Sequence, residues 1–239
     1  LPADGVVLAG RAMAAAADGA GLCAAVAGRA LMWPSLPTGL TAAVTLVDYQ
    51  PRLRAMVEGR LGPVAADTAL AMAAATVYAI TQAPSTVAVE FIRHLMQLGE
   101  SVSAADAWER RADALAAHAD RPDPTPAAQR PRPLPPGPVE RHSERSGVTQ
   151  GLAASSVGLL TRDLNLAATA AVVTAPKAAR NAREGFCSTL SRGLADRHGV
   201  LPLRREAVRM LDRIDAVVVD PRALATAQLR VSRLHGVAD

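Results

Sequence analysis

The chain has 239 residues, of which 50% are apolar and only 3% aromatic, and its formal net charge is +4. Because its basic residues are scattered and aromatic platforms are few, the composition excludes nucleic acid as a partner. The two cysteines, Cys23 and Cys187, lie far apart without metal-ligand spacing, which excludes a zinc site and favours free thiols.

The apolar residues are mainly Ala, Leu and Val, a composition that favours helices over sheets. Small apolar residues also allow close helix contacts in lipid, so we expect membrane lipid as a partner. The first residue is Leu1 rather than Met, and no secretory signal pattern follows it. We therefore expect the chain to be part of a longer protein.

The first predicted element covers residues 5–31 and is rich in Ala and Gly. Arg11, Asp18 and Arg29 interrupt it, so we predict an amphipathic or buried helix pair instead of one spanning helix. Residues 40–46 are compatible with either a short strand or the start of a helix. A turn then leads into a basic helix over residues 52–61.

Residues 68–83 form the longest uncharged apolar stretch, and Pro84 ends it. A returning helix is predicted for residues 85–98, with Glu90, Arg93 and His94 spaced to lie on one face. This face has two interpretations. It is either a stripe with one ion pair, or it contains Glu90 as an intramembrane carboxylate on a cation path.

A polar helix is predicted for residues 101–118, with Ser103 as its cap. The next segment, residues 120–147, contains eight prolines between Pro122 and Pro138. Such a segment predicts a semi-rigid linker without helix or strand. Its stretch at 131–135 also has the form of a ligand for SH3-type domains, so docking is the alternative interpretation.

After the linker, apolar character returns over residues 148–161 and 164–176, and a polar turn at Arg162-Asp163 separates two predicted helices. A basic amphipathic helix follows over residues 177–197, and Gly199 is suited to end it. The last unit is predicted to contain a helix over residues 205–213. A buried strand over residues 216–219 then ends at Asp220.

This last unit resembles the entry into the phosphorylation domain of P-type ATPases, in which a hydrophobic strand ends in D-K-T-G-T-L-T. The matching positions here read Asp220-Pro221-Arg222-Ala223-Leu224-Ala225-Thr226. Pro176 matches the proline that breaks the fourth core membrane helix of that family and frees backbone carbonyls for a cation. Its neighbours are Ala175 and Lys177, which supply neither a thiolate nor a carboxylate.

The resemblance implies the N-terminal, degenerate part of a large bacterial cation-transporting P-type ATPase. It implies a mainly α fold with short membrane helices in pairs, the Pro-rich linker, and a small α/β stub of the haloacid-dehalogenase type. We accordingly divide the chain into an Ala-rich helical region (1–66), a hairpin plus polar helix (67–119), the linker (120–147), further membrane helices and stalk (148–197), and the start of the phosphorylation domain (198–239).

The implied function is a catalytically silent segment of a multi-pass protein of the cell membrane. Asp220 occupies the phosphoryl-acceptor position, but Pro221 removes a backbone N–H and the family's Lys, and Leu224 replaces a hydroxyl. No cofactor is expected in this segment, whereas ATP and Mg²⁺ are expected for the parent protein. The expected partners are lipid, the remainder of the ATPase chain and a transported cation.

Two alternatives remain. One is a soluble helical interaction scaffold that uses the Pro-rich linker for docking. The other is an independent hydrolase of the haloacid-dehalogenase type that uses Asp220, but such enzymes place a second acid two residues later, where this chain has Arg222.

Overall fold

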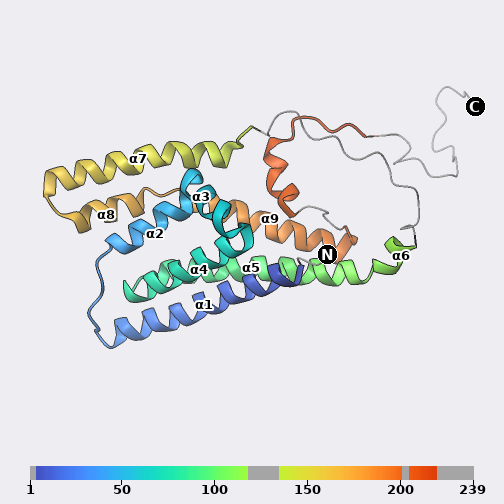
Figure 1. Cartoon of the computed structure of the whole chain (residues 1–239), viewed down its shortest axis with the longest axis horizontal. Helices are drawn as coiled ribbons and strands as arrows, with labels where there is room; N and C mark the ends of the chain where they lie inside the picture. The colour runs from blue at the N-terminus through green and yellow to red at the C-terminus, as the bar shows by residue number, and fades with distance from the viewer. Residues whose placement is uncertain (1–3, 118–134, 201–204, 220–239) are drawn as a thin grey trace, which may run out of the picture.

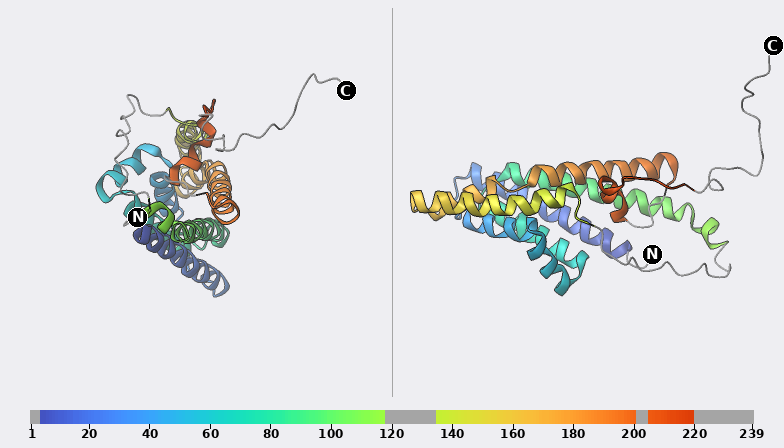
Figure 2. Two further views of the ribbon diagram at one scale, coloured as in Figure 1. Left: turned by 90° about the vertical axis from the view of Figure 1, so that its right-hand side faces the viewer. Right: turned by 90° about the horizontal axis from the view of Figure 1, so that it is seen from above.

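A computed structural model describes residues 4–117, 135–200 and 205–219 of the chain. The described residues are mainly helical, and none of them lies in a strand. The long helices run roughly along one common axis and build an elongated bundle, and the short helices α3 and η1 run across it (Figures 1 and 2). In chain order they are α1 (Asp4–Ala30), α2 (Gly39–Tyr49), α3 (Pro51–Leu61), α4 (Pro63–Ile80), α5 (Pro84–Glu109), α6 (Ala112–Ala116), α7 (Pro138–Thr161), α8 (Leu164–Val173), α9 (Lys177–His198) and the short 3₁₀ helix η1 (Arg205–Arg213).

Helix α1 lies against both α4 and α5, which makes these three helices one half of the bundle. The contact with α4 is close because α1 places glycines there. A Cβ built on Gly21 would lie 2.9 Å from the backbone oxygen of Ala75, and one on Gly10 would lie 2.8 Å from Oγ1 of Thr68. Small residues thus let the two backbones approach, as the Ala- and Gly-rich sequence of α1 indicates.

The other half of the bundle contains α2, α7, α8 and α9. Helix α7 packs on α8, α8 packs on α2, and α9 lies along α5. The predicted turn between α7 and α8 is confirmed: Arg162 adopts a left-handed conformation, and the Asp163 carboxylate accepts from the backbone N–H groups of Asn165 and Leu166. Gly199 likewise ends α9 in the left-handed conformation, as predicted.

Several helix boundaries differ from the sequence predictions. Helix α1 is one continuous helix and not a helix pair, because Arg11 and Asp18 turn inward to partners on α5, and Arg29 lies in its last turn. Residues 40–46 belong to a helix, α2, and not to a strand. Helix α5 continues to Glu109, so the separate polar helix predicted for residues 101–118 is wrong, and Ser103 lies inside α5 instead of capping a helix.

The Pro-rich segment was predicted to lack helix throughout residues 120–147. Helix α7 nevertheless begins at Pro138, so residues 138–147 are helical. Proline is well tolerated at the first position of a helix, where its missing N–H has no partner to lose. The region proposed for docking, residues 131–135, lies outside the described residues except for Pro135.

The buried strand predicted for residues 216–219 is wrong. Residues 214–219 have no regular structure, and their apolar side chains face solvent, Val218 being 98% exposed. A strand needs a neighbouring strand to pair its backbone groups, and the described residues supply none. The structure therefore does not show the predicted α/β stub, and Asp220 lies outside the described residues.

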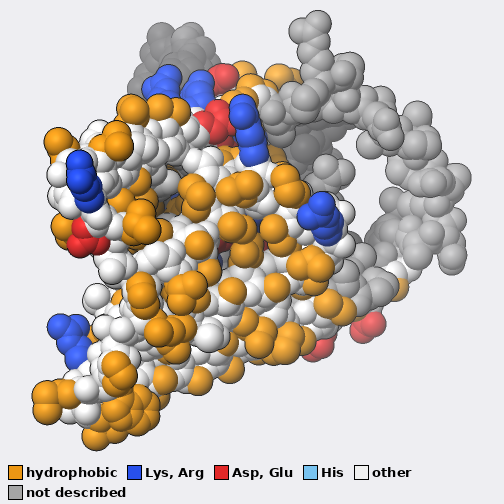
Figure 3. Space-filling model, turned by 60° about the vertical axis from the view of Figure 1, so that its left-hand side comes forward, with side chains coloured by type: hydrophobic (Ala, Val, Ile, Leu, Met, Phe, Trp, Pro, Cys, Tyr) orange, Lys and Arg blue, Asp and Glu red, His pale blue; other side chains and the backbone are white. Residues whose placement is uncertain are grey.

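The buried positions of the bundle are mostly small or polar. They are mostly alanines together with charged and polar residues such as Asp18, Glu90 and Glu100. Many Val, Leu, Ile and Met side chains are exposed instead. The end of the bundle that comes forward in Figure 3 is covered mostly by hydrophobic and uncharged groups, with few charged ones.

Candidate functional site

A cavity of about 460 Å³ opens between the helices and is lined by charged side chains. Its described lining includes six arginines and six carboxylates, so the formal charges balance. The arginines are Arg11, Arg54, Arg93, Arg180, Arg183 and Arg209, and the carboxylates are Asp18, Asp48, Asp67, Glu90, Glu140 and Glu184. We call this set the paired-charge cavity.

One chain of contacts links α1, α5 and α2 across the cavity. Oδ2 of Asp18, on α1, lies 2.5 Å from Nδ1 of His94 on α5. The other ring nitrogen, Nε2, lies 2.8 Å from Nη2 of Arg93. Arginine can only donate, so Nε2 of His94 accepts, and the ring proton sits on Nδ1 and is donated to Asp18. His94 is therefore neutral in this arrangement.

The same chain continues from Arg93 to Glu90 and Tyr49. Arg93 lies 2.7 Å from Oε2 of Glu90, and the hydroxyl of Tyr49 donates to Oε1 of Glu90 over 3.2 Å. Directly before Tyr49 on α2, the carboxylate of Asp48 pairs with Arg180 of α9 at 3.0 Å and with Arg54 of α3 at 2.6 Å. These contacts tie four helices together through buried charge.

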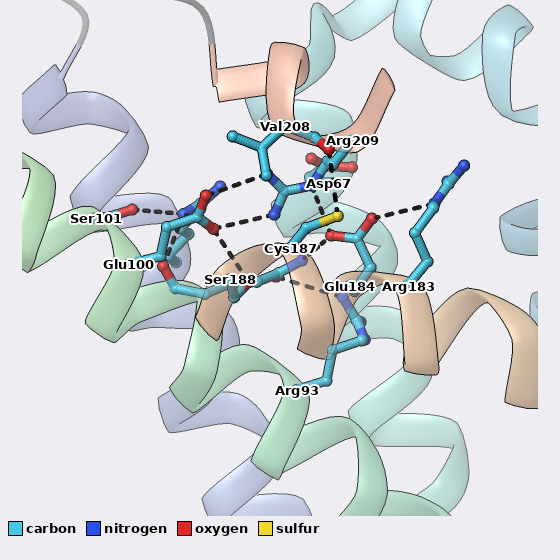
Figure 4. Close-up of polar contacts among 12 residues, drawn as sticks. Asp67, Arg93, Glu100, Ser101, Arg183, Glu184, Cys187, Ser188, Val208 and Arg209 are labelled. Carbon is cyan, nitrogen blue, oxygen red and sulfur yellow. Dashed lines mark hydrogen bonds and ion pairs between the residues drawn. The ribbon is translucent and has the colours of Figure 1, made fainter. Parts of the chain in front are cut away.

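A second cluster joins α5, α9 and η1 (Figure 4). Glu100 is 3% exposed, and its Oε2 accepts from Arg209, Ser188 and Arg11 over 3.0, 3.1 and 3.4 Å. Arg209 also donates from Nε to Glu184 over 2.8 Å. A single guanidinium therefore connects two buried carboxylates, which fixes η1 onto the bundle.

These charged groups are arranged to hold helices together more than to carry out catalysis. Each carboxylate described in the two clusters already has an arginine or a histidine beside it. Within the described residues, no three His, Cys, Asp or Glu side chains are grouped to hold a metal ion. Buried charges are costly without partners, so the arginines make the buried acids tolerable and hold the helices in register.

Comparison with known proteins gives the family context. Over 88% of its length the chain is 30% identical to the probable cation-transporting ATPase I of Mycobacterium leprae (strain TN). It is 29% identical to the protein of the same name from Mycobacterium tuberculosis, strain H37Rv, over the same share. The chain is homologous to a segment of these ATPases. It spans about 15% of their length. No family model matches it, and no solved structure matches it significantly.

The residues predicted for a functional site lie apart from one another. Glu90 lies in the cavity wall and forms the ion pair with Arg93 that the first interpretation predicts. Pro176 is buried in the break between α8 and α9, and the next residue, Lys177, donates to the hydroxyl of Tyr78 over 3.4 Å. Asp220 is outside the described residues. No contact joins these three residues into one site in the part of the chain that is described.

Most members of the paired-charge cavity were not predicted from the sequence. Asp18 was interpreted only as an interruption of its helix, and Glu100 and Glu184 were not singled out, although each is buried and partnered from another helix. A usable signal was present, because a lone charge in an Ala-rich helix is costly unless it meets an opposite charge. The choice of partner, however, depends on helix packing.

Among these carboxylates, Glu140 of α7 gives a prediction for acid conditions. Burial opposes its ionisation, but the hydrogen bond from Arg183 and the charges of Arg183 and Arg213 hold the pKa of this carboxyl below its usual value. A lowered folded-state pKa adds stability above the ordinary carboxyl pKa, and this stability is lost as pH falls through the lower folded value. We expect the thermal midpoint to fall on titration from pH about 6 to about 3.

In Glu140→Gln this acid-dependent loss should shrink, because the titrating group is gone. The exposed Glu144 on the same helix is the matched control, and Glu144→Gln should retain the profile of the unmodified chain. Identical pH profiles for Glu140→Gln and the unmodified chain would contradict the prediction.

Proposed function

We propose that the chain is a membrane-embedded, catalytically silent segment of a P-type cation-transporting ATPase. The observation that carries this proposal is the homology to the ATPase I proteins over 88% of the chain. The resemblance of Pro176 and of the residues around Asp220 to the P-type pattern supports it. The segment would assist folding or assembly of an active pump and would not perform the chemistry itself.

The distribution of apolar surface supports the membrane part of the proposal. Helices α1 and α4 are long and apolar enough to cross a bilayer. Core helices of soluble proteins pass the same length test, but they are mostly buried, whereas only 28% and 22% of the apolar windows of α1 and α4 are buried. Their exposed apolar side chains are suited to contact lipid. We propose a multi-pass location in the cell membrane on this basis.

We propose that the segment is catalytically silent because of residues Asp220 to Leu224. Phosphoryl transfer to a carboxylate requires donors and a metal around the phosphate, and Pro221, Ala223 and Leu224 remove the family's Lys, turn Gly and Thr at the matching positions. ATP and Mg²⁺ are proposed for the parent protein, together with the remainder of its chain as a partner. A role of Pro176 and Glu90 in a cation path stays a prediction. The charge of Glu90 is already offset by Arg93.

Membrane embedding is tested by flotation of the full chain with phosphatidylcholine vesicles on a density gradient. We expect the chain to float with the vesicles and to resist extraction by alkaline carbonate. A soluble interaction scaffold would remain at the bottom of the gradient and would stay dissolved without detergent. That result would overturn the proposal in favour of the scaffold.

Catalytic silence is tested by incubating the reconstituted chain with labelled ATP and Mg²⁺. We expect no acid-stable phosphate on the chain, and the same background for Asp220→Asn as for the unmodified protein, because the groups that handle phosphate are replaced. Label that is present on the unmodified chain and absent from Asp220→Asn would show that Asp220 is a phosphoryl acceptor.

A further inference from the structure

Helix α5 contains four titratable residues in its first 17 positions but exposes none of them. Glu90, His94 and Glu100 are paired with groups on α2, α1 and α9, and Arg93 lies between Glu90 and His94 in the cavity wall. From Pro84 to Ala105 the outer face of α5 exposes apolar side chains, namely Val89, Ile92, Leu95 and Val102. At 1.5 Å per residue this uncharged face is about 33 Å long, close to the hydrocarbon core of a bilayer, about 30 Å.

Two helices that pack on α5 continue this surface. Helix α1 exposes no charged side chain over residues 5–28, and α9 exposes none before Arg192. The stretch on α1 corresponds to about 36 Å of helix rise. We call the combined surface on α1, α5 and α9 the uncharged band. Inward-facing charges and an apolar outer face are what a helix bundle needs in lipid.

The two tryptophans of the chain lie near opposite ends of this band. Trp33 follows α1 and is 59% exposed, and its backbone oxygen accepts from the side chain of Gln82, close to the start of α5. Trp108 is near the end of α5. Twenty-four residues of α5 separate Pro84 from Trp108, or about 36 Å. Tryptophan collects at both interfaces of a membrane, where its ring is apolar and its N–H is hydrated.

We propose that the bundle spans the bilayer along its long axis, with the uncharged band in contact with acyl chains, Trp33 in one headgroup region and Trp108 in the other. This inference rests on the proposed membrane association and adds the orientation of the bundle and the depth of its tryptophans. It makes α5 a spanning helix, although only α1 and α4 of the described helices pass the hydropathy criterion. The charges of α5 lie on its protein-facing side, so the average hydropathy of the helix conceals its apolar outer face.

The inference is tested by depth-dependent fluorescence quenching of the full chain in vesicles with brominated lipids. Three single-tryptophan proteins are compared: Trp108→Phe retains Trp33, Trp33→Phe retains Trp108, and Leu95→Trp in the double-Phe background places the probe at mid-band. Lipids brominated near the chain ends should quench Leu95→Trp about twice as strongly as either natural tryptophan, and lipids brominated near the headgroup should show the reverse order.

Val89→Trp, on the same exposed face, replaces Leu95→Trp if that variant loses its helical circular dichroism. The proposal would be overturned if deep bromines quenched the mid-band tryptophan no more strongly than they quench Trp33 and Trp108. It would also be overturned if Trp33 were the deepest of the three probes, because the bundle would then enter one leaflet with its Trp33 end first. Failure of the chain to float with vesicles is a different result, and it would overturn the proposed function itself.

Discussion

Replacing Glu100 by alanine is expected to lower the free energy of unfolding by about 3–5 kcal/mol, the usual cost of breaking a buried ion pair on one side. The reason is the number of groups that depend on this one carboxylate. Arg209, Arg11 and Ser188 all donate to it, and two of them carry charge away from bulk solvent. Denaturant unfolding in detergent micelles, followed by circular dichroism, measures the loss.

Glu109, at the exposed end of α5, is the matched control. The same Glu-to-Ala change there should alter the unfolding free energy by less than about 0.5 kcal/mol, as is usual for surface substitutions. Glu100→Gln should fall between the two, because it retains the hydrogen-bond acceptor without the charge. Equal stabilities for Glu100→Ala and Glu109→Ala would show that the cluster in Figure 4 does not hold η1 on the bundle.

Replacing Gly21 by leucine is expected to destabilise the bundle by about 3 kcal/mol through overpacking between α1 and α4. Even a methyl group at this position would lie 2.9 Å from the backbone oxygen of Ala75, and backbone cannot rotate away as a side chain can. The two helices must separate at this position. The thermal midpoint in detergent and the rate of proteolysis between α1 and α2 report this separation.

Gly151→Leu provides the comparison, because a Cβ at Gly151 meets nothing within 4 Å. The substitution improves helix propensity by up to about 1 kcal/mol and introduces no clash, so α7 should be unchanged or slightly more stable. If Gly21→Leu matched Gly151→Leu in stability, α1 and α4 would not approach as closely as the structure indicates.

The helical class of this protein and several element ends follow from local sequence. Ala, Leu and Arg favour helix over long stretches, Arg162-Asp163 forms the turn before α8, and Gly199 accepts the left-handed conformation that ends α9. These features depend on neighbours within a few residues, which is why the sequence alone predicted them. The family resemblance also lay in short sequence patterns, and the homology to the ATPase I proteins confirms it.

Local sequence failed where the outcome depended on distant partners. Val217 and its neighbours have strand propensity, but the described residues offer no strand to pair with, so they remain irregular and exposed. Asp18 looked like an interruption of a helix, yet α1 continues through it because His94 of another helix donates a hydrogen bond to its carboxylate.

The sequence by itself therefore determined that the chain is helical, where several helices start and stop, and which family of proteins it resembles. Only the tertiary structure decided which charges meet and which surface is left uncharged. The physical reason is that a charge in an apolar helix is stable only beside a partner, and partners such as Glu100 and Arg209 are 109 residues apart. Helix packing brings them together and turns the apolar faces of α1 and α5 outward.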